Sequence, residues 1–375
     1  MELSEEHLML RDTVRAFTEK EIMPIADKLD REDRFPVELF KKFAKLGILG
    51  VITPEKYGGV GSDIMASVII LEELGKGSVA VAGSYEELAS VAIYQHGTET
   101  QRQKYLPPFF TGDCIGAFGL TEPGAGSDSV AIQTSALRSG DYYIINGNKI
   151  FITNGSIAHV FLIIAKTDKN KGAHGISAFI VEKESKGFSV SRELEKYGVR
   201  GSPTCELALE DVKVSAENLL GRENEGVSVM MALLDLDRTC FAAIGLGNAE
   251  AAFAASLKYS KEREQFGKPI SSFQLIKAKL ADMYTNIEAA RLLIYDTANM
   301  IDAGQKARKK AAATLLFTGE MGMKVCLEAV QIHGGYGYMM EFPVNRYFRD
   351  AKLFEIGAGT AEIRRLLIAR ELLEE

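Results

Sequence analysis

The sequence predicts an α+β protein in which helices come first, strands follow and long helices come last. Apolar residues recur at helical spacing up to about residue 112, and alternation with turn pairs replaces that spacing until about residue 220. Long helical patterns fill the rest of the 375-residue chain. The predicted domains are therefore an N-terminal helical domain over 1–112, a middle β domain over 113–220 and a C-terminal helical domain over 221–375.

Composition and charge argue against a nucleic-acid-binding protein, a membrane protein and a metalloprotein. A net charge of −7 argues against nucleic acid and anionic membranes as main partners. No apolar run is long and charge-free enough to span a bilayer, and the acidic start MELSEEHLML lacks the basic region of a targeting peptide. The four cysteines and five histidines are scattered, which favours reduced thiols in a cytoplasmic protein and indicates no metal site.

The N-terminal domain is predicted from a series of apolar stretches at helical spacing. The last of them is expected to end at Pro107–Pro108, because proline breaks a helix. Glu86 and Glu87 precede the stretch over 88–97. The favoured interpretation of this acidic pair is a helix start that faces solvent, and the alternative is a carboxylate that points into a ligand pocket.

The middle domain is predicted from alternating runs and turn pairs. Asn146–Gly147 lies between two β-rich runs in DYYIINGNKIFITNG and predicts a hairpin turn. Further strands are expected over 158–168, 174–184 and 204–215. A small domain of hairpins is expected to form a β-barrel or a sandwich.

The C-terminal domain is predicted from three long helical patterns joined by short segments. They cover 226–264, 271–304 and 309–335, and a fourth helix is expected over 360–375. Helices of this length with short connections favour an antiparallel four-helix bundle.

Four loop or strand stretches could carry chemistry, and each also has an ordinary structural explanation. GLTEPGAGSD (119–128) could hold a flat polar ring or a phosphate, or be a surface turn. KIFITNG (149–155) places an aromatic ring and a hydroxyl on one strand face, as ordinary packing also does. EREQFGKPISSFQ (262–274) carries an arginine that could meet a phosphate or simply end a helix. QIHGGYGY (331–338) is a glycine-rich loop after a helix.

Asp235, Asp237 and Arg238 interrupt a helix that is otherwise almost entirely apolar. A buried charge needs a partner or a polar cavity, so the interpretation is either an internal ion pair or a charged group that reaches a ligand pocket.

The stretch LFEIGAGTAEIRR (353–365) has three small residues between two elements. LFEI is predicted to be extended, and Thr360 is predicted to cap a helix with Ile363, Leu366 and Leu367 on one face. Small residues let a ligand approach the backbone, so this turn is a candidate ligand seat.

Taken together, these stretches resemble the flavin-dependent acyl-CoA dehydrogenase family over essentially the whole chain. The motifs GLTEPGAGSD, IFITNG, ALEDVKVS, KEREQFGKPISSFQ, QIHGGYGY and GAGTAEIRR occur in the family's order. The resemblance implies an all-helical N-terminal domain, a middle β-barrel and a C-terminal four-helix bundle, usually as a homotetramer. It also implies FAD, an acyl-CoA substrate and an electron-transferring flavoprotein as electron acceptor.

The resemblance further implies which residues bind the ligands. Those that match FAD-binding positions are Phe118, Leu120, Thr121, Gly126, Ser127, Phe151, Thr153, Arg263, Phe266, Gln274, Gln331, Gly334, Gly335, Thr360 and Glu362. The FAD diphosphate and adenosine positions lie partly across a subunit interface in the family. Those that match acyl-CoA positions are Ser127, Asp235, Arg238, Ala358 and Gly359.

The catalytic base departs from the usual pattern of the family. Most members carry it as the Glu of Tyr-Glu-Gly-Thr, and this chain has Gly357-Ala358-Gly359-Thr360. Either catalysis is lost or the base has moved. The isovaleryl-CoA type carries its Glu on the first long bundle helix, just before an Arg, and Asp237 matches that position. We therefore expect Asp237 to be the base, with a raised pKa, and the backbone N–H of Ala358 to hold the thioester carbonyl.

An aspartate places its carboxylate about 1.5 Å further back than a glutamate would. This difference favours a short branched-chain or alicyclic acyl group, for which Gly357 and Ala358 are also expected to leave room. The acyl group, the pathway and the physiological direction stay open from the sequence. An enoyl-CoA reductase, an oxidase and a non-catalytic flavin or acyl-CoA-binding homologue are the alternatives.

Overall fold

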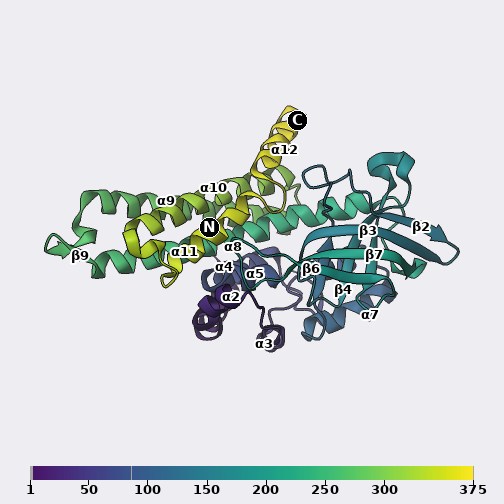
Figure 1. Cartoon of the computed structure of the whole chain (residues 1–375), viewed down its shortest axis with the longest axis horizontal. Coiled ribbons are helices and arrows are strands. Elements are labelled where there is room, and N and C mark those ends of the chain that lie inside the picture. The colour runs from purple at the N-terminus through teal and green to yellow at the C-terminus, as the bar shows by residue number, and fades with distance from the viewer. Residues whose placement is uncertain (1–2, 86, 375) are drawn as a thin grey trace.

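A computed structural model of the chain describes residues 3–85 and 87–374. Helices form both terminal parts, and a mixed sheet lies between them in the sequence. In Figure 1 the N-terminal helices lie below the centre, the sheet lies at the right, and the long C-terminal helices extend to the left. The predicted order of helical, β and helical parts is confirmed. Closure of the sheet into a barrel and a complete four-helix bundle stay predictions.

Helices make up the N-terminal part from Glu5 to Phe110. Polar side chains cap the start of several of these helices. At the start of α7, the Thr98 hydroxyl oxygen accepts from the Gln101 N–H, and the Gln101 side-chain oxygen accepts from the Thr98 N–H. The α-helices are α1 (Glu5–Phe17), α2 (Ala26–Glu32), α3 (Glu38–Leu46), α4 (Ile64–Gly77), α5 (Val79–Ser84), α6 (Leu88–His96) and α7 (Glu99–Phe110).

The expected helix end at Pro107–Pro108 is wrong, because α7 continues to Phe110. Proline lacks only the N–H donor, and its carbonyl still accepts hydrogen bonds. The Pro107 carbonyl accepts from the Thr111 N–H at 3.2 Å, and the Pro108 carbonyl accepts from the Asp113 N–H at 3.0 Å. These bonds close the final turn that the two prolines begin.

The sheet has the strand order β6-β7-β3-β2-β4-β5-β8, with β1 paired to β4. It is mixed because β1 and β2 run parallel to β4, whereas the other neighbours are antiparallel. The strands are β1 (Gly116–Gly119), β2 (Ser135–Ser139), β3 (Tyr142–Thr153), β4 (Val160–Lys166), β5 (Ile176–Glu182), β6 (Phe188–Glu193), β7 (Thr204–Ser215) and β8 (Leu219–Leu220).

The predicted hairpin turn at Asn146–Gly147 is wrong, because this pair lies inside the twelve-residue strand β3. The register against β7 shifts between Ile145 and Gly147, which marks a bulge. A Cβ at Gly147 would lie 2.3 Å from the Thr134 hydroxyl oxygen, so glycine is needed for a close approach. The preceding hairpin, between β2 and β3, turns instead at Gly140–Asp141.

Three long helices pack on one another in the C-terminal part: α8 (Gly226–Glu262), α9 (Gln274–Asp302) and α10 (Arg308–His333). The short strands β9 (Glu264–Gln265) and β10 (Lys268–Pro269) form a hairpin between α8 and α9. The helix α12 (Ala361–Leu373) packs against α10 and rises from the other helices in Figure 1.

The helix α8 also packs closely on the N-terminal helix α4. A Cβ at Gly247 would lie 2.1 Å from the carbonyl oxygen of Glu72, so the two backbones approach each other where glycine allows it. This contact fixes α8, which carries Asp237, against the N-terminal helices.

The expectation that LFEI (353–356) is extended is wrong. The helix α11 (Pro343–Ala351) continues into a 3-10 turn, η8 (Lys352–Glu355). This turn buries Phe354 against Phe241 of α8, with ring centroids 4.7 Å apart, while Leu353 and Ile356 stay exposed. Four residues are too few to distinguish the spacing of apolar residues in a helix from that in a strand. The contact of Phe354 with α8 favours the helical conformation.

Candidate active site

The residues that the resemblance assigns to ligands lie in three groups. A sheet group lies at the ends of β1 and β3, a middle group lies on α8 and the turn before α12, and an end group lies around the β9–β10 hairpin. Figure 1 shows the sheet and this hairpin at opposite ends of the molecule. The chain thus brings together the members of each group, but not the sheet group with the end group.

The sheet group is assembled by hydrogen bonds between two segments. The Ile150 N–H donates to the Thr121 carbonyl at 2.9 Å, which places Thr121 beside Phe151 and Thr153. Phe118 and Leu120 are half-buried at the end of β1, and Gly126 and Ser127 are exposed in the loop that follows.

A buried ion pair that sequence analysis did not identify holds this loop. The Lys149 ammonium donates to the Leu120 carbonyl at 2.9 Å and to a Glu122 carboxylate oxygen at 2.8 Å. Glu122 in turn accepts from the backbone N–H groups of Gln133 and Thr134, at 2.5 and 2.9 Å. Burial lowers the pKa of Lys149 to about 8, although Glu122 opposes that shift. A single lysine within the apolar run KIFIT was the signal that could have indicated it.

The sheet group fits the flat ring of FAD. Phe151 adopts a φ of 60° at a bulge in β3, and the residue is 64% exposed. Among residues 3–85 and 87–374, no partner is found for the side-chain hydroxyls of Thr121 and Thr153. An uncovered aromatic ring with two free hydroxyls nearby suits an isoalloxazine ring, which needs stacking and hydrogen bonds.

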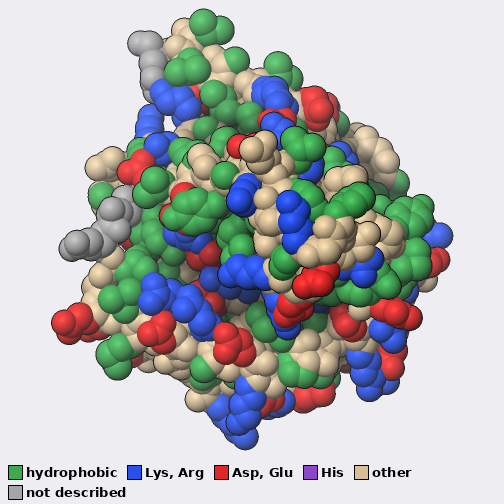
Figure 2. Space-filling view, turned by 90° about the vertical axis from the view of Figure 1, so that its left-hand side faces the viewer, with side chains coloured by type: hydrophobic (Ala, Val, Ile, Leu, Met, Phe, Trp, Pro, Cys, Tyr) green, Lys and Arg blue, Asp and Glu red, His purple; other side chains and the backbone are tan. Residues whose placement is uncertain are grey.

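The end group presents cations and uncovered aromatic rings. Arg263 lies over the Tyr336 ring at 5.6 Å, and Phe266 is 92% exposed. Figure 2 views this end and shows basic and hydrophobic side chains next to one another. Gln274, Gln331, Gly334 and Gly335 are exposed in the same group. An arginine beside aromatic rings suits a diphosphate and an adenine ring.

In the middle group, Asp235 and Asp237 have different environments although they lie two residues apart on α8. The Arg238 guanidinium donates to Asp235 at 3.0 Å, and Arg308 approaches the other Asp235 oxygen at 3.8 Å. The expected internal ion pair therefore exists, and it involves Asp235. For the half-buried Asp237, no hydrogen bond or ion pair is found within the described part of the chain.

Burial raises the pKa of Asp237 from 3.8 to about 6, against the opposing positive charges of Arg238 and Arg364. A carboxylate with this pKa is ionised at neutral pH and can still take up a proton, as a general base must. The expectation of a raised pKa agrees with the structure. The role of Asp237 as base stays a proposal.

The turn that precedes α12 has an unusual backbone. Ala358 has a φ of 53° and Gly359 a φ of 93°, both in the left-handed region. The Arg238 Nε donates to the Ala358 carbonyl at 3.3 Å, and no acceptor is found for the Ala358 N–H among the described residues. Thr360 caps α12 by accepting from the Ile363 N–H at 3.3 Å, and Glu362 is exposed. In this turn the Ala358 carbonyl is therefore bound by Arg238, and the Ala358 N–H is available to a ligand.

The space beside Gly357 is not free, contrary to the sequence-based expectation. A Cβ at this position would lie 2.9 Å from the Phe241 ring. The glycine is needed because α8 places an aromatic side chain there, so room for an acyl group at this turn depends on Ala358 alone.

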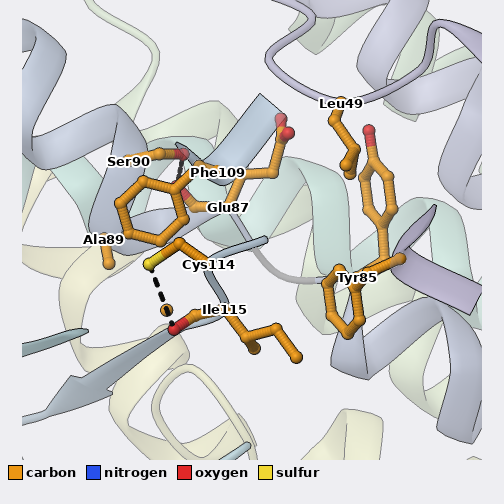
Figure 3. Close-up of a pocket in the computed structure, with 10 residues that line it drawn as sticks. Leu49, Tyr85, Glu87, Ala89, Ser90, Phe109, Cys114 and Ile115 are labelled. Atoms are coloured by element: carbon orange, nitrogen blue, oxygen red, sulfur yellow. Dashed lines mark hydrogen bonds between the residues drawn. The ribbon is translucent and has the colours of Figure 1, made fainter. Parts of the chain in front are cut away.

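The favoured interpretation of Glu87 as a solvent-facing residue is wrong, and Glu86 lies outside the described residues. Glu87 accepts from the Gly50 N–H at 2.5 Å, and burial raises its pKa to about 7 against backbone hydrogen bonds from Gly50 and Val51. Figure 3 shows its carboxylate directed toward Leu49 and away from Cys114, at the edge of a cavity of about 20 Å³. Glu87 therefore anchors the loop around Gly50.

Comparison with protein-family models covers nearly all of the chain. Residues 4–113 match the model described as acyl-CoA dehydrogenase, N-terminal domain; residues 117–212 match the middle domain and residues 224–373 the C-terminal domain. Within the described residues, no helix meets the length and apolarity needed to cross a membrane, and no cluster of three or more metal-ligating side chains occurs.

Similar proteins cover the chain from end to end. A probable acyl-CoA dehydrogenase of Bacillus subtilis, YngJ, is 47% identical over 100% of this chain and 99% of its own. The mitochondrial isovaleryl-CoA dehydrogenase of Pongo abelii is 44% identical over 98% and 89%. The solved butyryl-CoA dehydrogenase of Megasphaera elsdenii has a TM-score of 0.97 at 42% identity, over 100% and 99%. A chain in a structure described as the electron transferring flavoprotein of Acidaminococcus fermentans has a TM-score of 0.98 at 44% identity, over 100% of both chains.

Proposed function

This chain belongs to the acyl-CoA dehydrogenase family of FAD-dependent oxidoreductases, and we propose that it oxidises an acyl-CoA thioester between Cα and Cβ with Asp237 as the base. The observation that carries this proposal is the state of Asp237. Its carboxylate is half-buried, has a pKa of about 6 and, within the described residues, has no hydrogen-bond partner of its own.

The chain's own residues would divide the work as follows. Asp237 takes the proton from Cα, and the Ala358 N–H donates to the thioester carbonyl, which makes that proton more acidic. Bound FAD supplies the acceptor for the hydride that leaves Cβ. Thr121, Phe151 and Thr153 hold the flavin ring, and the remaining residues of the sheet group line the same site.

The substrate is proposed to be a short branched-chain or alicyclic acyl-CoA. An aspartate reaches about 1.5 Å less far than a glutamate, and an error near 1 Å costs on the order of 10²-fold in rate. A bulky group next to Cα would bring that carbon toward Asp237. Ala358 leaves room for it, although Phe241 fills the space beside Gly357.

Assembly is part of this proposal, because the end group and the sheet group are separated within one chain. We propose that the end group, with Arg263, Phe266 and Gln274, binds the diphosphate and adenosine of an FAD whose ring is held by another copy. The same proposal includes a homotetramer, a cytoplasmic location and an electron-transferring flavoprotein as electron acceptor. It also includes a β-barrel in the middle domain, a C-terminal four-helix bundle and domain boundaries at 112/113 and 220/221.

The test is anaerobic bleaching of the flavin by a panel of straight, branched and alicyclic acyl-CoAs. Rapid bleaching by a branched or alicyclic member, with formation of the enoyl-CoA, is the expected result. A purified protein that holds FAD and is not bleached by any member would contradict the proposal. Re-oxidation of reduced enzyme by enoyl-CoA, faster than any bleaching, would instead assign the reductase direction.

A further inference from the structure

Among residues 3–85 and 87–374, Arg364 is the largest fully buried side chain, with 1% exposure. It lies in the first turn of α12, four residues after Thr360, and its charge interacts with Asp237 and Arg238. Burying a guanidinium is costly unless the group is fully paired, and the Arg364 Nε has no acceptor among the described residues. A side chain kept there at such a cost requires an explanation.

The remaining donors of Arg364 bind backbone carbonyls of the turn. Its Nη1 donates to the Phe354 carbonyl at 2.7 Å, and its Nη2 donates to the Gly357 carbonyl. A weaker contact at 3.5 Å joins Nη1 to the Leu315 carbonyl of α10. Arg238 holds the next carbonyl, that of Ala358, at 3.3 Å. Two arginines therefore hold the carbonyls of residues 354, 357 and 358.

We propose that Arg364 is a positioning residue that forms the thioester seat: it holds the turn so that the Ala358 N–H, and no carbonyl, faces the substrate. A peptide group has its N–H and C=O on opposite sides. Tying the Gly357 carbonyl back to Arg364 therefore directs the N–H of the same peptide unit, which is that of Ala358, the other way. This inference rests on the proposed function of the turn.

The charge of Arg364 gives it a second effect on the same reaction. Together with Arg238 it lowers the pKa of Asp237, against the larger effect of burial. Glu355 and Glu320 also act on Arg364, and Cys240 lies in the field of Asp237. Burial itself lowers the pKa of Arg364 to about 10, so the guanidinium stays charged at neutral pH.

The test compares two ligands on the holoenzyme: an enoyl-CoA thioester and the S-alkyl-CoA thioether of the same chain length, which lacks the carbonyl. Arg364→Met should weaken thioester binding on the order of 10-fold and leave thioether binding nearly unchanged. It should also shift the acid limb of kcat/KM to higher pH. Arg364→Lys keeps a charge but not the planar fork, so it should lose part of the thioester preference and keep the pH profile.

Arg365→Met is the matched control, because it removes the same charge from the exposed face of the same helix, where Arg365 pairs with Glu320. It should change neither ligand's affinity. Equal losses for both ligands, or no loss, in the Arg364 variants would overturn the inference. If Arg364→Met yields no folded holoenzyme, Arg364→Lys decides on the same criterion. If the wild-type enzyme does not bind the thioester more tightly than the thioether, the proposed role of the turn itself is overturned. If the variants are bleached by substrate and still prefer the thioester as the wild type does, only the role of Arg364 is overturned.

Discussion

Asp237 and Glu87 are both half-buried residues near Cys240, and their carboxylates differ in their hydrogen-bond partners. The pKa of the Cys240 thiol is raised by burial and then by both of these charges, so the two groups share one region of the interior. Glu87 accepts from the Gly50 N–H, whereas Asp237 has no hydrogen bond from the described residues.

This difference separates a structural from a reactive carboxylate. A group whose lone pairs already accept backbone N–H bonds fixes a loop and loses that contact when it moves. A group without partners is free to receive a proton, at the cost of stability in the unliganded protein. Raised pKa values alone do not separate the two, because burial raises the pKa of both, to about 6 and about 7.

The largest expected effect is on turnover. Asp237→Asn should lower kcat by about 10³- to 10⁴-fold, because a positioned general base contributes up to about that much. The FAD absorbance should be retained. Glu87→Gln keeps an oxygen that can accept from the Gly50 N–H and should change kcat by less than about threefold. Stopped-flow flavin reduction measures both. A larger loss in the Glu87 variant would reverse the comparison.

The next effect is on stability. The substitutions Asp237→Asn and Glu87→Leu should change the free energy of unfolding in opposite directions. The folded pKa of Asp237 lies above its ordinary value, so the stability it contributes is present below pH 4 and is lost as pH rises through about 6. Asp237→Asn should therefore stabilise the protein at pH 7, by up to about 3 kcal/mol.

Glu87→Leu should instead destabilise by about 1–3 kcal/mol, since the Gly50 N–H loses its acceptor. Thermal unfolding of the holoenzymes at pH 7 provides both values. Destabilisation by Asp237→Asn would indicate a partner for this carboxylate that the structure does not contain.

A smaller effect concerns pH. Since the base must be ionised, kcat/KM should fall about tenfold per pH unit below pH 6. Glu87→Gln should leave that acid limb in place. An acid limb near pH 7 that vanishes in Glu87→Gln would assign the reacting carboxylate to Glu87 instead.

The smallest expected effect is on selectivity. Asp237→Glu moves the carboxylate forward by about 1.5 Å and should raise kcat/KM for a straight-chain relative to a branched acyl-CoA, by roughly tenfold. The ratio of the two kcat/KM values measures it. An unchanged ratio would mean that the reach of residue 237 does not select the substrate.

The sequence was sufficient for the order of the three parts and for the family, because long helical periods and six motifs in register are strong signals. It was not sufficient where a contact overrides a local pattern. Asn146–Gly147 has the residues of a hairpin turn, yet Thr134 requires a glycine in mid-strand. Asp237 could be selected from its motif, and the fold adds the physical difference that the motif does not show, which is that Asp235 has an ion-pair partner.

Glu87 and Arg364 were beyond the sequence for a similar reason. Leu366 was expected on the apolar face of α12, and the structure leaves it 66% exposed while burying Arg364. Hydropathy assigns charges to the surface, so it cannot detect a guanidinium that is buried because it donates to the Phe354 and Gly357 carbonyls of the turn before its own helix. The Gly50 N–H that binds Glu87 is 37 residues away in the chain, so no local pattern indicates that contact.

The separation of the sheet from the β9–β10 hairpin has a thermodynamic consequence. On the proposal that each FAD is shared by two chains, association of the subunits and occupancy by the flavin are linked equilibria. Dilution should then release the cofactor, and excess free flavin should restore the oligomer at the same protein concentration.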